Sequence, residues 1–168
     1  MKKIALLGAT VALVMAAGSA SAANSLNSGS LGFNVSTQDS FIINGKYLFA
    51  KDMAVLAGFG LRVQGGDNNN RGTDIGLMGG FRKYLKTDDL APFVGGRINY
   101  SSTVDSTVVA MGVTAEAGAE YFLAKQFSIE GRVGFGYSST ENKPVGGATT
   151  KTNYIGSTAF GISANFYF

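Results

Sequence analysis

Apolar and polar residues alternate with a period of two along most of the chain, the pattern of β-strands whose two faces differ. No segment of useful length shows the 3.6-residue period of a helix. We predict eight strands, at about residues 29–36, 41–50, 53–64, 73–85, 91–101, 108–123, 126–138 and 153–168. Most exceed the roughly 5 or 6 residues of a typical strand and match the roughly 9 to 11 of a tilted strand that crosses a bilayer.

The two faces of the predicted strands carry different chemistry. Within 126–138, one face holds Phe127, Ile129, Val133, Phe135 and Tyr137, and the other holds Ser128, Glu130 and Arg132. In a soluble sheet protein, the apolar face would form the core and the polar face would meet water. In a transmembrane barrel, the apolar face meets lipid and the polar face lines the interior.

Glycine distinguishes these two arrangements. The chain has 24 Gly, and roughly half of those beyond residue 22 fall on the polar face, among them Gly95, Gly118 and Gly136. Glycine weakens a solvent-exposed strand, whereas in a narrow closed barrel it leaves room for an Arg or Tyr from a neighbouring strand. We therefore predict an all-β fold, an eight-stranded antiparallel up-and-down transmembrane β-barrel.

The connections support this prediction. Those at 51–52, 86–90 and 124–125 are short, and those at 65–72, 102–107 and 139–152 are longer, as for periplasmic turns and extracellular loops, although 37–40 is brief. Aromatic residues gather near the predicted strand ends: Phe49, Tyr121, Phe127, Phe166 and Phe168 toward the periplasm, and Phe41, Tyr100, Tyr137 and Tyr154 toward the exterior.

The first 22 residues read as a cleaved signal peptide. A basic start at Lys2 and Lys3 precedes the apolar run 4–17, and Ala20 and Ala22 form a small-x-small cleavage signal. A transmembrane anchor is the alternative, but the run is shorter than the roughly 20 residues that a spanning helix needs. Removal of 1–22 lowers the formal charge from +3 to +1 (3 − 2) and leaves one domain, 23–168, without a basic stripe for nucleic acid.

The composition excludes several kinds of catalytic and metal site. The chain has no Cys and no His, which excludes thiolate nucleophiles, Ser-His-Asp triads and sites built on imidazole. Residues 67–72 resemble the start of a calcium loop, but Arg71 and Met78 stand where oxygen ligands are needed. We predict a solvated turn there, and a protein that is not an enzyme and holds no cofactor or metal. A lipid-facing surface would explain the charged share of 15%, against roughly 25% in soluble domains.

Charged residues on the polar face are nearly balanced in sign. They are Lys46, Arg62, Arg82, Arg97 and Arg132 against Asp74, Glu116, Glu120 and Glu130. They could line a pathway for ions or small solutes, or they could form an ion-pair network that plugs the barrel. Buried charges persist when paired, and eight strands enclose an interior just wide enough for side chains, so we favour the plug. We expect Arg132 to lie within cross-strand reach of Glu116.

The chain resembles the small eight-stranded outer-membrane barrels, the superfamily of the outer membrane protein A barrel domain, its X-type relatives and the opacity and attachment-invasion proteins. The resemblance rests on the signal peptide, on "LAPFVGGRINYS" and "GAEYFLAKQFSIEGRVGFGYS", and on the ending "GISANFYF". It implies that Ile162, Ala164, Phe166 and Phe168 form the signal read by the barrel-assembly machinery. It also implies the outer membrane of a Gram-negative bacterium, in contact with lipid and lipopolysaccharide.

A plugged interior predicts a structural role for the barrel. The resemblance further implies binding of a host or surface ligand through the extracellular loops, as in adhesion or resistance to host defences. The alternative is a narrow channel for small or apolar solutes. Related barrels that are enzymes use an active-site His, which this chain lacks. We therefore expect the protein to be non-enzymatic.

Overall fold

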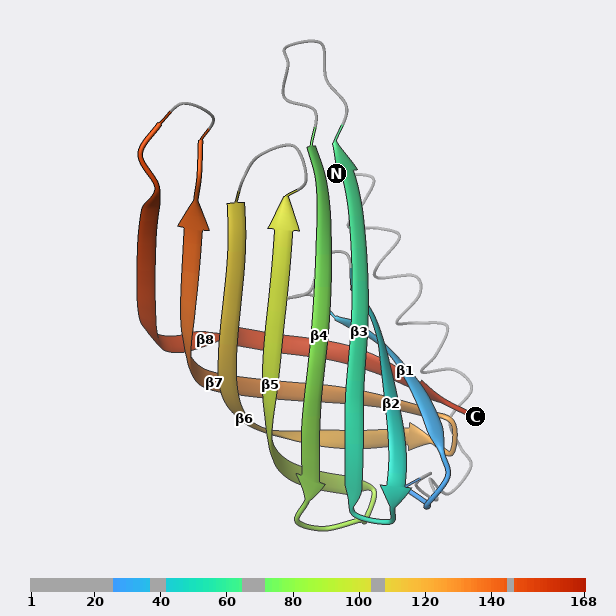
Figure 1. The fold of residues 1–168 in the computed structure, drawn as a ribbon. Coiled ribbons are helices and arrows are strands. Elements are labelled where there is room, and N and C mark those ends of the chain that lie inside the picture. The colour runs from blue at the N-terminus through green and yellow to red at the C-terminus, as the bar shows by residue number, and fades with distance from the viewer. Residues whose placement is uncertain (1–25, 37–41, 65–71, 104–107, 145–146) are drawn as a thin grey trace, which may run out of the picture.

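The fold is a closed barrel of eight antiparallel strands in sequence order, β1 to β8 (Figure 1). It comes from a computed structural model that describes residues 26–36, 42–64, 72–103, 108–144 and 147–168. The strands are β1 (Leu31–Ser36), β2 (Ile42–Ala50), β3 (Met53–Gln64), β4 (Gly72–Tyr84), β5 (Leu90–Thr103), β6 (Val108–Ala124), β7 (Phe127–Asn142) and β8 (Thr150–Tyr167). The predicted fold class is thus confirmed in its strand number, pairing and closure.

Some sequence predictions fall outside the described residues. The signal peptide at 1–22, with Ala20 and Ala22, is one of them, and the calcium-loop resemblance at 67–72 lies almost wholly in another. No helix in the described part of the chain is long and apolar enough to cross a membrane.

The barrel closes where the first strand meets the last. Gly32 to Ser36 of β1 pair with Tyr167 to Ser163 of β8, and these two strands lie side by side near the C-terminus in Figure 1. The turns after β2, β4 and β6 lie at the end of the barrel where β1 begins and β8 ends, which we call the turn end. β3, β5 and β7 end at the opposite end, the loop end. The connection after β5, residues 104–107, is shorter than residues 85–89 after β4, so the predicted contrast between short turns and longer loops holds for the connections after β3 and β7 and not for the one after β5.

The hairpin of β7 and β8 is longer than the sequence predicts. Pairing continues from Ser139 opposite Asn153 to Asn142 opposite Thr150. Glu141 stands opposite Lys151, and cross-strand pairs of opposite charge stabilise a sheet. The expected loop at 139–152 is therefore partly strand.

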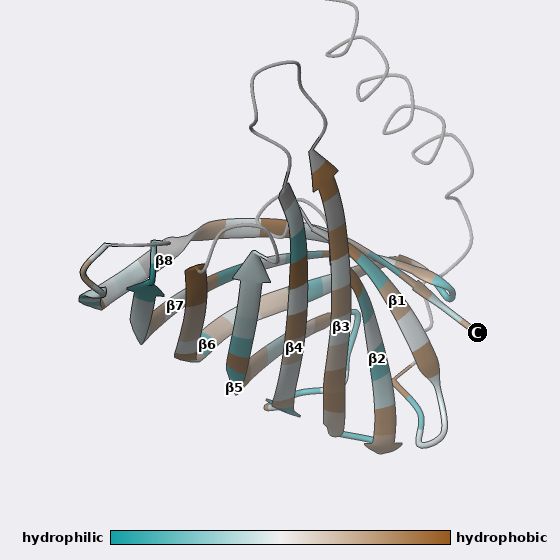
Figure 2. Ribbon diagram, turned by 45° about the horizontal axis from the view of Figure 1, so that its top comes forward, coloured by the Kyte–Doolittle hydropathy of each residue, from teal (hydrophilic) through white to brown (hydrophobic). Residues whose placement is uncertain are grey.

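Apolar side chains cover the outside of the barrel. Large hydrophobic residues are exposed on all eight strands, including Phe59 on β3, Ile98 on β5 and Phe135 on β7, the last with 61% of its surface exposed. Figure 2 shows the same alternation as brown bands along β2, β3 and β4. The polar face points inward, which is the inside-out arrangement that the glycine positions predict.

One part of β8 departs from the predicted alternation. Continuous alternation places Tyr154 and Gly156 on the outer face, but a bulge shifts the register between Arg132 and Gly134. Beyond it, Tyr154 pairs with Ser138 and Gly156 with Gly136, so both share the inner face. Because a bulge adds one residue to one strand, it exchanges the two faces. Tyr154 lies near the loop end, as the sequence predicts, but on the inner face, where 59% of its surface is exposed.

Inward glycines stand beside large inward side chains. Gly95 lies between Arg82 on β4 and Glu116 on β6 in the strand register. A Cβ at Gly95 would lie 2.5 Å from the carbonyl oxygen of Phe81 and 3.3 Å from Cα of Arg82. At its neighbour Gly96, which faces outward, the nearest atom would be 3.6 Å away. This confirms that glycine makes room inside the barrel.

We expect Gly95→Ala to lower the free energy of unfolding by about 1–3 kcal/mol, because the backbone of β4 must move to accept the methyl group. The matched variant Gly96→Ala adds the same group outside and should stay within about 0.5 kcal/mol of the parent. Urea unfolding of both variants in the same detergent measures the difference. Equal effects would contradict the assignment of the crowded face.

The charged interior as candidate functional site

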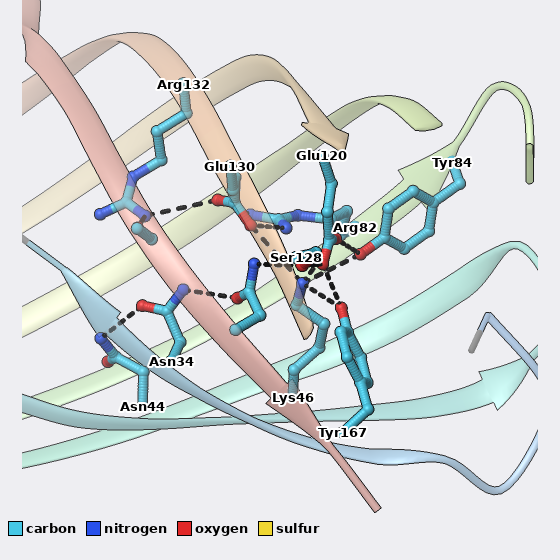
Figure 3. Close-up of polar contacts among 12 residues, drawn as sticks. Asn34, Asn44, Lys46, Arg82, Tyr84, Glu120, Ser128, Glu130, Arg132 and Tyr167 are labelled. Carbon is cyan, nitrogen blue, oxygen red and sulfur yellow. Dashed lines mark hydrogen bonds and ion pairs between the residues drawn. The ribbon is translucent and has the colours of Figure 1, made fainter. Parts of the chain in front are cut away.

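A cluster of charged side chains fills the middle of the barrel (Figure 3). We define the interior network as Lys46, Arg82, Arg97, Glu116, Glu120, Glu130 and Arg132, which come from β2, β4, β5, β6 and β7. All except Arg97 are buried, and the side chain of Arg97 is 9% exposed. These side chains meet because each occupies an inward position of its strand. The interior network thus contains seven of the nine charged residues that the sequence predicts for the interior, in the part of the chain that the structure describes.

The other two predicted interior charges do not join the interior network in the described contacts. Asp74 accepts a hydrogen bond of 2.6 Å from Oγ1 of Thr103, on the adjacent strand near the loop end. Arg62 pairs with Asp74 in the backbone register of β3 and β4, but its side chain lies outside the described part.

Two carboxylates face each other at the centre of the interior network. Glu120 and Glu130 are directly opposite in the pairing of β6 and β7, an arrangement that destabilises a sheet unless cations lie between them. Nζ of Lys46 lies 2.9 Å from Oε2 of Glu120 and 3.5 Å from Oε2 of Glu130. Lys46 therefore bridges the two carboxylates.

Arg82 is the second cation at this position. Its Nη1 and Nη2 donate to the two oxygens of Glu130 at 2.6 and 2.9 Å, a bidentate pair, and Nη2 also donates to Glu116 at 3.1 Å. The guanidinium carbon lies 3.6 Å from the ring centre of Phe93, in a cation–π contact. Glu116 also lies 2.7 Å from Nε of Arg97. One arginine thus links β4 to β6 and β7.

Neutral side chains complete the coordination of Glu120. Tyr84, Tyr167 and Ser128 all donate hydrogen bonds to its carboxylate, and Lys46 donates to both tyrosine hydroxyls, at 3.1 and 2.9 Å. Sequence reasoning that looked for charges missed these three residues. Ser128 and Tyr167 do alternate onto the polar face of their strands, which is the signal that could have found them.

A chain of amides crosses the seam where the barrel closes. Asn44 on β2 donates to Asn34 on β1 at 3.4 Å, Asn34 donates to Asn165 on β8 at 2.6 Å, and Asn165 donates to Ser128 on β7 at 3.1 Å. All four side chains are buried. Polar contacts therefore connect the closing strands to the interior network.

Arg132 lies on the loop-end side of this central group. Its Nη1 donates to Oγ of Ser163 at 3.0 Å and lies 3.5 Å from Oε1 of Glu130. The register places Arg132 opposite Gly118, two residues from Glu116 along β6. The reach of Arg132 to Glu116 stays a prediction.

Little open space remains within the interior network. A cavity lined by Asn34, Lys46, Arg82 and Glu130, among others, has a volume of about 10 Å³, enough for roughly one water molecule. The described residues contain no group of three or more acidic, His or Cys side chains placed to hold a metal ion. The arrangement neutralises and immobilises charge, and it leaves no room here for a substrate.

An exposed ion pair lies at the turn end. Lys83 on β4 donates a hydrogen bond to Asp52 in the turn after β2, and this bond is the main reason that the pKa of Asp52 is lowered from its ordinary value. A lowered pKa means that the contribution is present above the ordinary carboxyl range and is lost as the pH falls. Because both side chains are well exposed, water screens the pair and its contribution is small.

The C-terminal residues with the predicted assembly role share the outer face of β8. Ile162, Phe166 and Phe168 are exposed, and Ala164 is partly exposed. Their common outward orientation agrees with the period-two pattern. Recognition by assembly machinery stays a prediction.

Comparisons with known proteins give a likeness in fold alone. No family model and no curated protein matches the sequence. Among solved structures, the chain is similar to the N-terminal β-barrel domain of Pseudomonas aeruginosa OprF, with 11% sequence identity and a TM-score of 0.46. The match covers 84% of this chain and 98% of that chain.

Proposed function

We propose that the protein is a non-enzymatic barrel of the outer membrane of a Gram-negative bacterium, with a plugged interior, a structural role and a loop end that binds surface ligands. The observation that carries the proposal is the apolar outer face of a closed barrel. Soluble monomers rarely expose contiguous apolar patches above a few hundred Å². Here large hydrophobic side chains are exposed on every strand.

Closure of the barrel supports lipid as the surrounding medium. A bilayer core contains no water to satisfy free N–H and C=O groups, so a sheet can span it only as a closed barrel. Aromatic side chains lie near both ends of the apolar face, with Phe49 and Tyr121 toward the turn end and Tyr100 and Tyr137 toward the loop end. Such positions suit the two membrane interfaces.

The interior network supports a structural role over transport. Its carboxylates are held by cations from other strands, and the adjoining cavity admits about one water. The outer face of the barrel then contacts lipopolysaccharide and lipid, and the loop end binds a host or surface ligand. Recognition by the assembly machinery would use the exposed C-terminal residues of β8.

A narrow channel is the second candidate. The observation that favours it is the exposure of Asn99 on β5. Asn99 pairs directly with the buried Met78 of β4, so it lies on the inner face of the barrel. Water therefore reaches the inner face near the loop end. A channel would require this wet region to continue past Arg97 and Arg132.

Bilayer conductance and cell binding separate these functions, and fractionation with gel mobility tests the membrane location. If the proposal holds, membrane fractionation finds the protein in the outer membrane with a heat-dependent shift in gel mobility. The barrel also shows no steady conductance in planar bilayers, and shortening of the connections at 67–71 and 143–149 abolishes binding to cells. Absence from outer-membrane fractions would refute the membrane location. Steady conductance with unchanged cell binding would favour the channel.

We expect Arg132→Ala to destabilise the barrel more than it changes permeability. The substitution removes the contacts with Glu130 and Ser163, and loss of a hydrogen bond that involves a charged group costs about 1.5–3 kcal/mol. Urea unfolding and bilayer conductance of the same preparation check both effects. A clear gain of conductance without loss of stability would contradict the plug.

A further inference from the structure

We propose that Leu26 is a stopper that seals the turn end of the barrel with an apolar layer, separate from the interior network. This goes beyond the proposed function because it concerns access to the interior from one end, whatever surrounds the barrel. The interior then has two barriers in series, one made of paired charges and one made of hydrocarbon.

The seal consists of one side chain from outside the strands and a ring of inward side chains. Leu26 has none of its surface exposed and packs in a single cluster. The other members are Leu48, Ala54, Tyr84, Ala91, Phe93, Phe122 and Tyr167, from β2, β3, β4, β5, β6 and β8. Leu48, Ala54, Tyr84, Ala91 and Phe122 all lie within three residues of a strand end at the turn end. Leu26 therefore fills the mouth that these side chains leave.

Hydrogen bonds hold the segment before β1 across this mouth. The backbone N–H of Gly29 donates to the carbonyl of Leu48 at 2.7 Å, and Leu48 donates to the carbonyl of Ser30 at 2.9 Å. Oγ of Ser28 donates to the carbonyl of Phe49 at 3.0 Å. Gly29 has a φ of +92°, a left-handed conformation that reverses the chain and that other residues rarely adopt. The segment is thus tied to the end of β2.

The apolar layer and the interior network meet at two tyrosines. The rings of Tyr84 and Tyr167 belong to the cluster around Leu26, and their hydroxyls donate to Glu120. Water or an ion that enters from the turn end would have to pass Leu26 and these rings before it reaches a charge.

Thiol accessibility tests the stopper, because the chain has no Cys of its own. Ala54→Cys places one thiol in the apolar layer, where Ala54 is fully buried. The full-length chain is exported, purified in detergent and treated with a charged methanethiosulfonate reagent. We expect the thiol to react at least tenfold faster in the double variant Ala54→Cys with Leu26→Gly than in Ala54→Cys alone. The rate should rise roughly in proportion to the fraction of molecules in which the turn end is open.

Control variants separate sealing from folding. Asn27→Ala shortens an exposed side chain of the same segment and should leave the thiol protected. Leu26→Ala should give an intermediate rate if Leu26→Gly does not fold, and heat-dependent gel mobility reports folding for each variant. Equal reaction rates with Leu26 and with Leu26→Ala in folded barrels would overturn the proposal, and so would equal exposure of the thiol by Asn27→Ala and Leu26→Ala.

Discussion

Replacement of Arg82 by Met is expected to lower the free energy of unfolding by about 3–5 kcal/mol. The substitution keeps an apolar stem but removes the bidentate pair with Glu130, the bond to Glu116 and the cation over Phe93. It leaves Glu120 and Glu130 opposite each other with Lys46 as the one bridging cation that the described contacts show. Urea unfolding, followed by gel mobility without heating, measures the loss.

The neighbouring Lys83→Met is the matched control. Lys83 follows Arg82 in the sequence but faces outward and makes an exposed ion pair with Asp52. Its loss should cost about 1 kcal/mol or less. The double variant Arg82→Met with Glu130→Gln should recover part of the stability, because it also removes a buried carboxylate. Equal destabilisation by Arg82→Met and Lys83→Met would contradict the central role of the interior network.

Val133→Arg is the second substitution with a large expected effect. Val133 points outward on β7, midway between Phe127 and Tyr137, and is about half exposed. If this face meets the hydrocarbon core, a charge there costs about 2–4 kcal/mol in folding stability in lipid vesicles. If the face met water, arginine at an exposed position would change stability by about 0.5 kcal/mol or less.

Ser139→Arg controls for the chemistry of the substitution. Ser139 lies on the same face of the same strand, six residues closer to the loop end than Val133. Its neighbours in the register are Met111 of β6 and Asn153 of β8. It lies beyond Tyr137 and two residues before Glu141, which stands opposite Lys151, so a long basic side chain there reaches water or headgroups. We expect little change in stability. Equal stability of Val133→Arg and Ser139→Arg in vesicles would argue against lipid contact.

Much of the fold could be predicted from the sequence because apolar and polar residues alternate with a period of two along the strands of such a barrel. Alternation such as that from Phe127 to Tyr137 places each side chain inside or outside without knowledge of its partners. The inward position of Gly95 could be predicted for the same reason. The interior charges follow from strand assignment alone, which is why seven of them meet as expected.

The remaining features depend on register and on contacts between distant segments. The bulge opposite Arg132 moves Tyr154 inward, and no turn or glycine signal in the sequence distinguishes its position. The choice of partners in the interior network depends on the register of each strand relative to its neighbours. Because of this register, Arg82 rather than Arg132 lies closest to Glu130. Leu26 precedes the first strand, and its burial depends on a mouth built by six other strands.

Lipid contact of the outer face is the central claim, and depth-dependent fluorescence quenching tests it most directly. The chain has no Trp, so Phe135→Trp on the outer face and Phe122→Trp in the interior each give a single emitter. Both variants are folded into vesicles whose phosphatidylcholine carries brominated acyl chains. The account predicts strong quenching of Phe135→Trp and weak quenching of Phe122→Trp, since Phe135 is 61% exposed and Phe122 is fully buried. Unquenched, water-like emission from Phe135→Trp in the folded barrel would contradict it.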